Sequence, residues 1–262
     1  MEQQYFVNGE ILPASRAKLL ISDLALLRGF GIFDFFRTSN GKPFLMEHYL
    51  DRFFTSAGLM DLQIPFQKNK IEEVVNDLIK RNGFQEAGIR MVLTGGYTLD
   101  SYTPTDPNYF ILIEKINYPD PDYYQKGIKL ITYEHKREWS EIKSINYLTP
   151  IKIRKQIIDK DGFDVLYHYD GNFLEVSRSN FFIIRDGVLI TPGKNVLHGV
   201  TRKTVIEISK QVMKVEERDI PVSELFLANE VFLTGTTKRI LPITLVDNQQ
   251  ISDGNRDHLL KN

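Results

Sequence analysis

Two prolines within three residues interrupt the middle of the chain, and they constrain its architecture more than any other feature. Pro119 and Pro121 lie in the polar run NYPDPD at residues 117–122. Such a stretch breaks helices and strands and is typical of a linker. We therefore expect a small N-terminal α/β domain over residues 1–117, a linker over 118–125 and a larger C-terminal domain over 126–262. A chain of 262 residues is long enough for two domains.

Strand and helix patterns alternate in the N-terminal part. Asn8-Gly9 lies between two apolar runs and predicts a β-hairpin, and a second hairpin is expected to turn at residues 39–42. Two helices follow, over residues 47–59 and along the apolar stripe of residues 71–79, the second of which ends at Gly83. Residues 89–93 and 109–116 read as strands. This order predicts an α/β layer.

The C-terminal part continues the mixed pattern, so we expect an α/β (α+β) fold overall. Its expected elements are a strand at residues 127–133, a helix capped by Thr149 with Pro150 first and Gly162 at its end, hairpin turns at Asp170-Gly171 and Asp186-Gly187, a helix with Val205, Ile208 and Val212 on one face, and strands at 231–234 and 240–246. The polar residues from about Asp253 are expected to fray.

Composition excludes several classes of function. Lys plus Arg number 33 and Asp plus Glu 34, so the formal net charge of −1 gives no attraction to nucleic acid or to an anionic membrane. The chain has no cysteine, and its five histidines show no metal-ligand spacing, so neither disulfides nor a metal site are expected. No apolar run approaches the roughly 18 residues of a membrane span, and the start MEQQ lacks the features of a signal peptide. A cytoplasmic protein is the default expectation.

Short motifs of arginine, lysine, threonine and glutamate carry the functional signal. They are RGFGIFD at residues 28–34, EHYLDR at 47–52, IKSINY at 142–147, LEVSRSN at 174–180, LHGVTR at 197–202 and TGTT at 234–237. In this order and spacing they resemble the class IV (fold type IV) aminotransferases, which use pyridoxal 5′-phosphate (PLP). The resemblance spans roughly residues 5–247. It implies a two-domain, D-amino-acid-aminotransferase-like fold whose C-terminal domain binds PLP.

The resemblance makes Lys143 the catalytic lysine, which holds PLP as a Schiff base. Its amine would also carry a proton between the substrate Cα and the cofactor. Glu175 takes the place of the carboxylate that pairs with the pyridine nitrogen and keeps it protonated.

The other cofactor contacts are also implied by position in the motifs. Arg52 would bind the phosphate through charge-assisted hydrogen bonds. The amides of Val200 and Thr201 would form an anion site where a loop enters a helix, and Thr236 and Thr237 would add donors from a second turn. Tyr147 is expected near the cofactor ring.

Three arginines are candidates for substrate binding. Arg28 belongs to the segment that in this family lines the substrate side of the cofactor, and Arg90 lies on a strand that faces the active site. Together they would suit a substrate with two carboxylates, such as glutamate or 2-oxoglutarate. Arg178 stands in LEVSRSN, where small or neutral residues are commoner.

These features favour a non-canonical D-amino-acid aminotransferase. The usual D-type carboxylate trap, Arg-x-His, is absent from the loop GGYTLDSYTP at residues 95–104, and Arg28 and Arg90 are expected to replace it. The expected reaction transfers the amino group of a D-amino acid, such as D-glutamate or D-alanine, to 2-oxoglutarate or pyruvate. An L-branched-chain aminotransferase, an aminodeoxychorismate lyase and a PLP-binding protein without turnover remain alternatives. The resemblance also implies a homodimer with its active site at the subunit interface.

Overall fold

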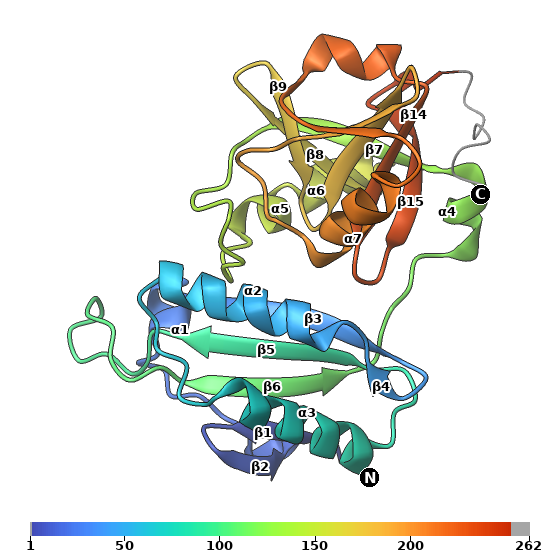
Figure 1. Cartoon of the computed structure of the whole chain (residues 1–262). Coiled ribbons are helices and arrows are strands. Elements are labelled where there is room, and N and C mark those ends of the chain that lie inside the picture. The colour runs from blue at the N-terminus through green and yellow to red at the C-terminus, as the bar shows by residue number, and fades with distance from the viewer. Residues whose placement is uncertain (1, 253–262) are drawn as a thin grey trace. The chain divides into compact units, whose positions relative to one another are not determined.

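The computed structural model describes residues 2–252 of the chain, which divide into two compact units (Figure 1). The first unit contains the residues up to Asn117 together with Ile142–Asn146. The second contains Tyr118–Glu141 and the residues from Tyr147 onward. The domain limits expected from the sequence stay a prediction. The expected fraying from Asp253 concerns residues outside the described part of the chain.

The first unit is built on an antiparallel sheet of six strands in the order β2-β1-β6-β5-β3-β4. The strands are β1 (Gln4–Val7), β2 (Glu10–Pro13), β3 (Gly31–Ser39), β4 (Lys42–Pro43), β5 (Gly88–Thr94) and β6 (Tyr109–Glu114). The hairpin predicted at Asn8-Gly9 is present, and the second turns at Asn40-Gly41. Both asparagines have positive φ, near 50°, which is the left-handed backbone that a type I′ turn requires.

Two long helices cover one face of this sheet. The unit's helices are the 3₁₀ helix η1 (Ala14–Arg16), α1 (Leu24–Arg28), α2 (Met46–Leu59) and α3 (Lys68–Asn82). The stripe that predicted α3 is its buried face, and Gly83 ends the helix with φ of 67°, as expected. Phe53 of α2 packs on Tyr109 of β6, whose ring is fully buried. The faces of α2 and α3 therefore hold the core of this unit.

Alternation along β3 and β5 sends a second set of side chains to the opposite face. Phe33 and Phe35 point away from the helix-covered side, and Phe35 pairs across the sheet with Arg90 of β5. These three side chains are half-buried. This face therefore carries Arg90, one of the three arginines predicted to bind the substrate.

The second unit is built on a mixed sheet in the order β12-β11-β10-β14-β15-β7-β8-β9-β13, with β16 beside β15. Its strands are β7 (Ile128–Glu134), β8 (Asp164–Tyr169), β9 (Asn172–Val176), β10 (Asn180–Arg185), β11 (Val188–Thr191), β12 (Lys214–Glu217), β13 (Ile220–Pro221), β14 (Glu230–Gly235), β15 (Arg239–Val246) and β16 (Gln249–Gln250). The hairpins predicted at Asp170-Gly171 and Asp186-Gly187 are present, with positive φ at all four residues.

The helices of the second unit are α4 (Pro121–Lys126), α5 (Leu148–Lys152), α6 (Arg154–Asp159), α7 (Val200–Ser209) and the 3₁₀ helix η2 (Val222–Leu227). Ile206 of α7 packs against the stacked rings of Phe182 and Phe232. Ile157 of α6 packs on a second cluster with Val165. A third and larger cluster of buried apolar residues includes Leu130 of β7, Phe181 of β10 and Leu233 of β14.

One helix prediction in this unit is wrong in its details. Residues 149–162 do not form one helix capped by Thr149. Instead α5 begins at Leu148 with Tyr147 as its N-cap, and the chain is interrupted at Ile153 before α6. Ile153 is buried among the apolar residues beside the sheet, so tertiary packing outweighs the local cap signal. Val212 likewise lies beyond the last residue of α7.

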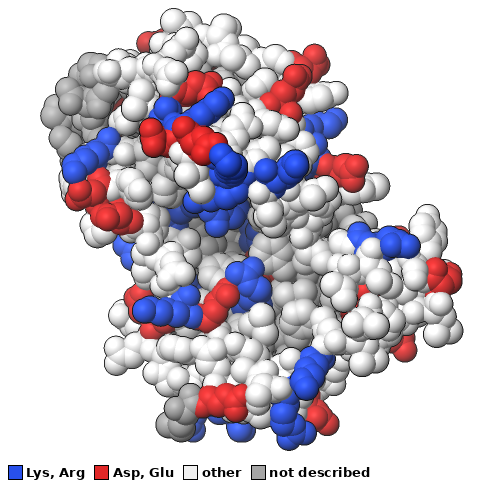
Figure 2. Space-filling view, turned by 180° about the vertical axis from the view of Figure 1, so that it is seen from behind, with Lys and Arg blue, Asp and Glu red and all other residues white. Residues whose placement is uncertain are grey.

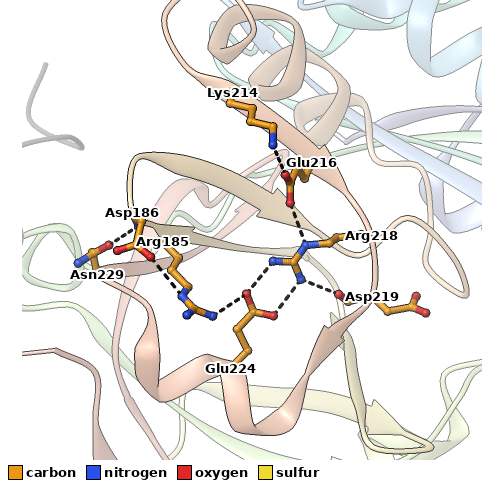
Figure 3. A network of polar contacts seen from close by, with 8 residues as sticks. All are labelled: Arg185, Asp186, Lys214, Glu216, Arg218, Asp219, Glu224 and Asn229. Carbon is orange, nitrogen blue, oxygen red and sulfur yellow. Dashed lines mark hydrogen bonds and ion pairs between the residues drawn. The ribbon is translucent and has the colours of Figure 1, made fainter.

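On the face viewed in Figure 2, Lys and Arg lie beside Asp and Glu at several places, among larger areas of other residues. In the second unit, eight polar residues link β10, β12, η2 and the loops beside them, with Arg218 and Glu224 at the centre (Figure 3). Within residues 2–252, none of the helices combines the length and apolar character needed to cross a bilayer.

Candidate active site

Lys143 lies on a segment that pairs with the first residues of β3. The Phe33 amide donates to the Lys143 carbonyl at 2.9 Å, and the Ile145 amide donates to the Gly31 carbonyl at 3.1 Å. The Lys143 amide itself lies 3.4 Å from the Ser56 hydroxyl of α2. A Cβ on Gly31 would lie 2.7 Å from a carbonyl of β5, so only glycine fits at this start of β3. The backbone of Lys143 is thus fixed by the first unit.

The Lys143 side chain belongs to an aromatic and cationic cluster on the open face of that unit's sheet. Its Nζ lies 4.4 Å from the centre of the Phe33 ring. The Arg90 guanidinium lies 5.4 Å from the same ring and 5.2 Å from the ring of Phe35. Cations this close to a ring face are attracted to it. Two predicted site residues therefore share Phe33 as a neighbour, and Arg90 also pairs with Glu114 at 2.6 Å.

Arg52, the predicted phosphate ligand, is held by a buried carboxylate. Its Nε and Nη2 donate to the two oxygens of Asp34 at 2.9 and 2.6 Å, and it lies over the Tyr49 ring. Asp34 is fully buried on β3, whereas the Arg52 side chain keeps 13% of its surface exposed. The forked contact fixes the plane of the guanidinium. Asp34 had no predicted role.

Arg28 is placed differently from Arg90. It ends the short helix α1, is exposed, and donates from Nη1 to the carbonyl of Leu27. The start of α1 is firmly anchored, because the buried Asp23 caps the amide of Ala25 and accepts from Thr94. The helix therefore has a fixed start, while the Arg28 side chain reaches solvent.

In the second unit Glu175 is buried and has two donors. Arg137 Nε donates to its Oε1 at 2.7 Å, and the Leu197 amide donates to its Oε2 at 3.0 Å. Arg137 also donates to the carbonyl of Ser140, which holds its guanidinium in the loop before Lys143. The carboxylate is therefore held by one donor on each oxygen, and the Arg137 guanidinium pairs with it at 2.7 Å.

Asn180 links the segments that carry predicted cofactor contacts in this unit. Asn180 donates to the Leu197 carbonyl at 2.6 Å, which joins the turn after β9 to the loop that enters α7. Asn180 also pairs across the sheet with Thr234, which precedes the turn with Thr236 and Thr237. Gly199 is the N-cap of α7, and a Cβ there would lie 2.1 Å from Asn180 Oδ1. Glycine at this position permits the close approach of the two loops.

The remaining predicted contacts of this unit are Tyr147 and Arg178. Tyr147 is half-buried and lies near Tyr167, whose pKa is raised chiefly by burial and then by the charges of Asp164 and Glu175. Arg178 is largely exposed, and its Nη2 lies 3.8 Å from the Asp164 carboxylate. The structure therefore offers Arg178 a carboxylate of the protein as a neighbour.

The donor set of the second unit fits a phosphorylated pyridine cofactor. The first hydrogen bond of α7 runs from the Lys203 amide to the carbonyl of Gly199. The amides of Val200 and Thr201 lie before it and have no acceptor within the helix. No side chain caps this helix end, which is the kind of site that binds phosphate. Thr236 and Thr237 lie on a half-buried turn after β14, and Glu175 supplies the carboxylate.

Sequence reasoning missed four charged residues that the structure places in contact with site residues or their loops. They are Asp34, Arg137, Asp164 and Lys238. Two had a signal, since Asp34 and Asp164 lie within apolar strands, where a charge needs a partner. Among the described residues, no group of three or more His, Asp or Glu side chains could hold a metal ion.

Comparison with known proteins gives one family match. The family described as "Amino-transferase class IV" matches residues 31–246. A D-alanine aminotransferase of Listeria monocytogenes is 27% identical over 259 residues, which cover 95% of this chain and 90% of the relative. A putative branched-chain-amino-acid aminotransferase of Methanocaldococcus jannaschii is 31% identical over 261 residues, with coverage of 95% and 89%.

Solved structures give the same fold. The T.th. branched-chain amino acid aminotransferase with pyridoxamine 5′-phosphate superposes with a TM-score of 0.89 at 25% identity, over 99% of this chain and 90% of that one. The Escherichia coli branched-chain enzyme superposes with a TM-score of 0.90 at 23% identity, over 100% and 92%. The fold type IV architecture expected from the motifs is confirmed.

Proposed function

We propose that this chain, which belongs to the class IV aminotransferases, transfers the amino group of a D-amino acid to a 2-keto acid. D-glutamate or D-alanine would be the donor, and 2-oxoglutarate or pyruvate the acceptor. Enzymes of this class depend on PLP, and the expected cofactor is thereby confirmed. PLP supplies an electron sink that stabilises negative charge at the substrate Cα.

The family resemblance assigns the roles of individual residues, and the donor set of the second unit supports them. Lys143 would hold the cofactor covalently and carry the proton at the substrate Cα. Glu175, which accepts a hydrogen bond from Arg137, would keep the proton on the ring nitrogen. The phosphate would be held by Arg52, Val200, Thr201, Thr236 and Thr237, and Tyr147 would lie beside the ring.

One observation carries the substrate class. Phe33 has the Lys143 Nζ at 4.4 Å and the Arg90 guanidinium at 5.4 Å from its ring centre. An arginine that shares an aromatic neighbour with the reactive amine is suited to hold a substrate carboxylate near it. Arg28 and Arg178 are both exposed, and they would make additional contacts with the substrate.

The choice of hand rests on the relatives. Several D-alanine aminotransferases of Listeria and Staphylococcus resemble this chain along 95% of its length. The branched-chain resemblance supports the alternative, an L-branched-chain aminotransferase. The lyase that acts on aminodeoxychorismate is a third candidate that would use the same lysine.

A half-reaction screen tests the proposal. The PLP-loaded protein is mixed with the D and L forms of glutamate, alanine, leucine and valine, and the absorbance of the cofactor is followed. We expect D-glutamate or D-alanine to convert it to the aminated form, and Lys143→Ala to abolish the change. A faster response to L-leucine or L-valine would contradict the D-assignment. Release of pyruvate from aminodeoxychorismate without amino transfer would favour the lyase.

We also infer a homodimer, because the family resemblance implies a site completed by a second subunit. The test is the mass of the purified protein in solution by light scattering. A monomer that is fully active at the lowest measurable concentration would contradict this inference.

A further inference from the structure

Lys238 is a buried lysine in the same turn as Thr236 and Thr237, between β14 and β15. Its Nζ donates to Asp164 Oδ2 at 3.2 Å and to the Ser179 hydroxyl at 3.0 Å. The side chain is 9% exposed and that of Asp164 is 4% exposed. A pair this deeply buried is uncommon, because both ions lose their hydration.

Asp164 extends the contact to the turn after Glu175. Its Oδ1 accepts from the Ser177 hydroxyl at 2.5 Å and from the Val165 amide at 2.8 Å. Lys238 reaches Ser179 of the same turn. One ion pair therefore joins the start of β8, residues 177–179 and the turn between β14 and β15.

The charges of the pair support each other. Burial opposes ionisation of Asp164, but the Lys238 ammonium, the Ser177 hydroxyl and the Arg178 guanidinium hold its pKa below the usual value. Burial lowers the pKa of Lys238, and Asp164 opposes that shift. An apolar pair would fill this space at lower cost in desolvation. The stability of the fold alone is therefore a weak explanation for this buried ion pair. A better explanation is that the pair fixes the positions of the segments that it joins.

We propose that Lys238 and Asp164 are positioning residues that set the spacing between two cofactor-binding turns. The turn that contains Lys238 also carries Thr236 and Thr237, which would hold the phosphate. The turn beside Asp164 follows Glu175, which would hold the ring nitrogen. Phosphate and ring nitrogen are a fixed distance apart within one rigid cofactor, so the two turns must keep a matching distance. The inference rests on the cofactor contacts assigned above.

Binding of PLP to the apoprotein tests the proposal directly. Trp139 is the only tryptophan of the chain and is 73% exposed, in the loop whose Arg137 contacts Glu175. Its fluorescence reports binding as PLP is titrated, without any turnover. Lys238→Met removes the ammonium, and Ser179→Ala removes only the hydroxyl that accepts from it. Lys126→Met is the matched control, because Lys126 pairs with Asp122 on an exposed helix of the same unit.

We expect Lys238→Met to raise the Kd for PLP about tenfold to a hundredfold, since hydrogen bonds between charged groups contribute about 1.5–3 kcal/mol. Ser179→Ala should raise it less, and Lys126→Met should leave it unchanged. Melting of each apoprotein is followed in parallel. A lower Tm with an unchanged Kd in both test variants would overturn the proposal. If Lys238→Met does not fold, an unchanged Kd in Ser179→Ala would overturn it alone.

These outcomes separate the proposal from the proposed function. A wild-type apoprotein that fails to bind PLP would contradict the cofactor assignment, and the positioning role with it. A wild type that binds PLP but ignores D-amino acids would contradict only the substrate assignment. A wild type and Lys238→Met variant with equal affinity would contradict only the positioning role.

Discussion

Arg90 on β5 donates from Nη2 to Oε1 of Glu114 on β6, at 2.6 Å, on the open face of the sheet in the first unit. Both side chains are about one third exposed, at 35% and 37%. The arginine proposed to bind a substrate carboxylate therefore already has a carboxylate neighbour. A substrate must compete with Glu114 or share the guanidinium with it.

Replacing Glu114 with glutamine should favour dicarboxylic substrates. The variant removes the competing charge but keeps the shape of the side chain. Exposed ion pairs contribute up to about 1 kcal/mol, so kcat/KM for glutamate and 2-oxoglutarate should rise about twofold to fivefold. The values for alanine and pyruvate should hardly move. Asp77→Asn, which breaks the exposed pair with Arg81, is the control. An equal change for both classes of substrate would refute competition by Glu114.

Replacing Arg90 with methionine should have the opposite selectivity. The apolar stem still packs on Phe35, but the guanidinium is lost. We expect kcat/KM for dicarboxylic substrates to fall about tenfold to a hundredfold, because charged hydrogen bonds contribute about 1.5–3 kcal/mol. Monocarboxylic substrates should lose much less. Equal losses across all substrates would mean that Arg90 has a structural role only.

Local signals explain why much of the fold could be predicted. The turns at Asn8-Gly9, Asp170-Gly171 and Asp186-Gly187 depend on the backbone preferences of two adjacent residues, and all three are present. The stripe of α3 and its glycine stop are equally local. The helix expected after Thr149 failed because the buried position of Ile153 depends on strands distant in sequence.

The partners of the site residues could not be predicted for the same reason. Arg52 and Asp34 are 18 positions apart, Arg137 and Glu175 are 38, and Lys238 and Asp164 are 74. Such pairs form only when segments from different parts of the chain meet in the folded protein. The motifs could assign roles to Arg52 and Glu175, but nothing in their spacing names the groups that orient them.

Replacing Glu175 with glutamine should separate binding from catalysis. Glutamine can still accept from the Leu197 amide, so the variant should keep most of its affinity for PLP. It cannot hold a proton on the ring nitrogen as a carboxylate does. We expect kcat to fall by a factor of about 100 or more, as for other groups that hold a proton in catalysis. Loss of PLP affinity with an unchanged kcat at saturating PLP would show that Glu175 is only a ligand.

Replacing Asp34 with asparagine should destabilise the protein. Asp34 is fully buried, and its loss leaves the Arg52 charge without its bidentate partner. Breaking a buried pair in this way costs about 3–5 kcal/mol. Urea unfolding should show this as a lower midpoint. Asp51→Asn breaks an exposed pair with Lys68 and should change the midpoint little. Similar midpoints for the two variants would show that Arg52 finds another partner at low cost.

The network of Figure 3 gives the protein a pH-dependent contribution to stability. Arg218 donates to both carboxylate oxygens of Glu224, at 2.9 and 2.7 Å, and to Glu216. These hydrogen bonds from Arg218 hold the pKa of Glu224 below its ordinary value of 4.5. A carboxyl group with a lowered pKa in the folded state stabilises that state at higher pH.

Glu224→Gln should therefore cost most at neutral pH and least in acid. The network's contribution from Glu224 is fully present above about pH 5 and is lost as the pH falls through the lowered pKa. Loss of a charged, largely buried hydrogen-bond partner costs about 2 kcal/mol. At pH 7 this should lower the Tm by roughly 5 °C relative to the wild type. The difference in Tm should shrink as the pH falls from about 5 through the lowered pKa of Glu224, because the wild type then loses the contribution that the variant already lacks. Glu207→Gln is the control, because Glu207 forms only a weak ion pair with Lys203, with 3.9 Å between Oε1 and Nζ. Its Tm should not differ from that of the wild type in this pH-dependent way. A gap for Glu224→Gln that stays constant from pH 7 to pH 3 would mean that packing, and not the charge of Glu224, holds η2 in place.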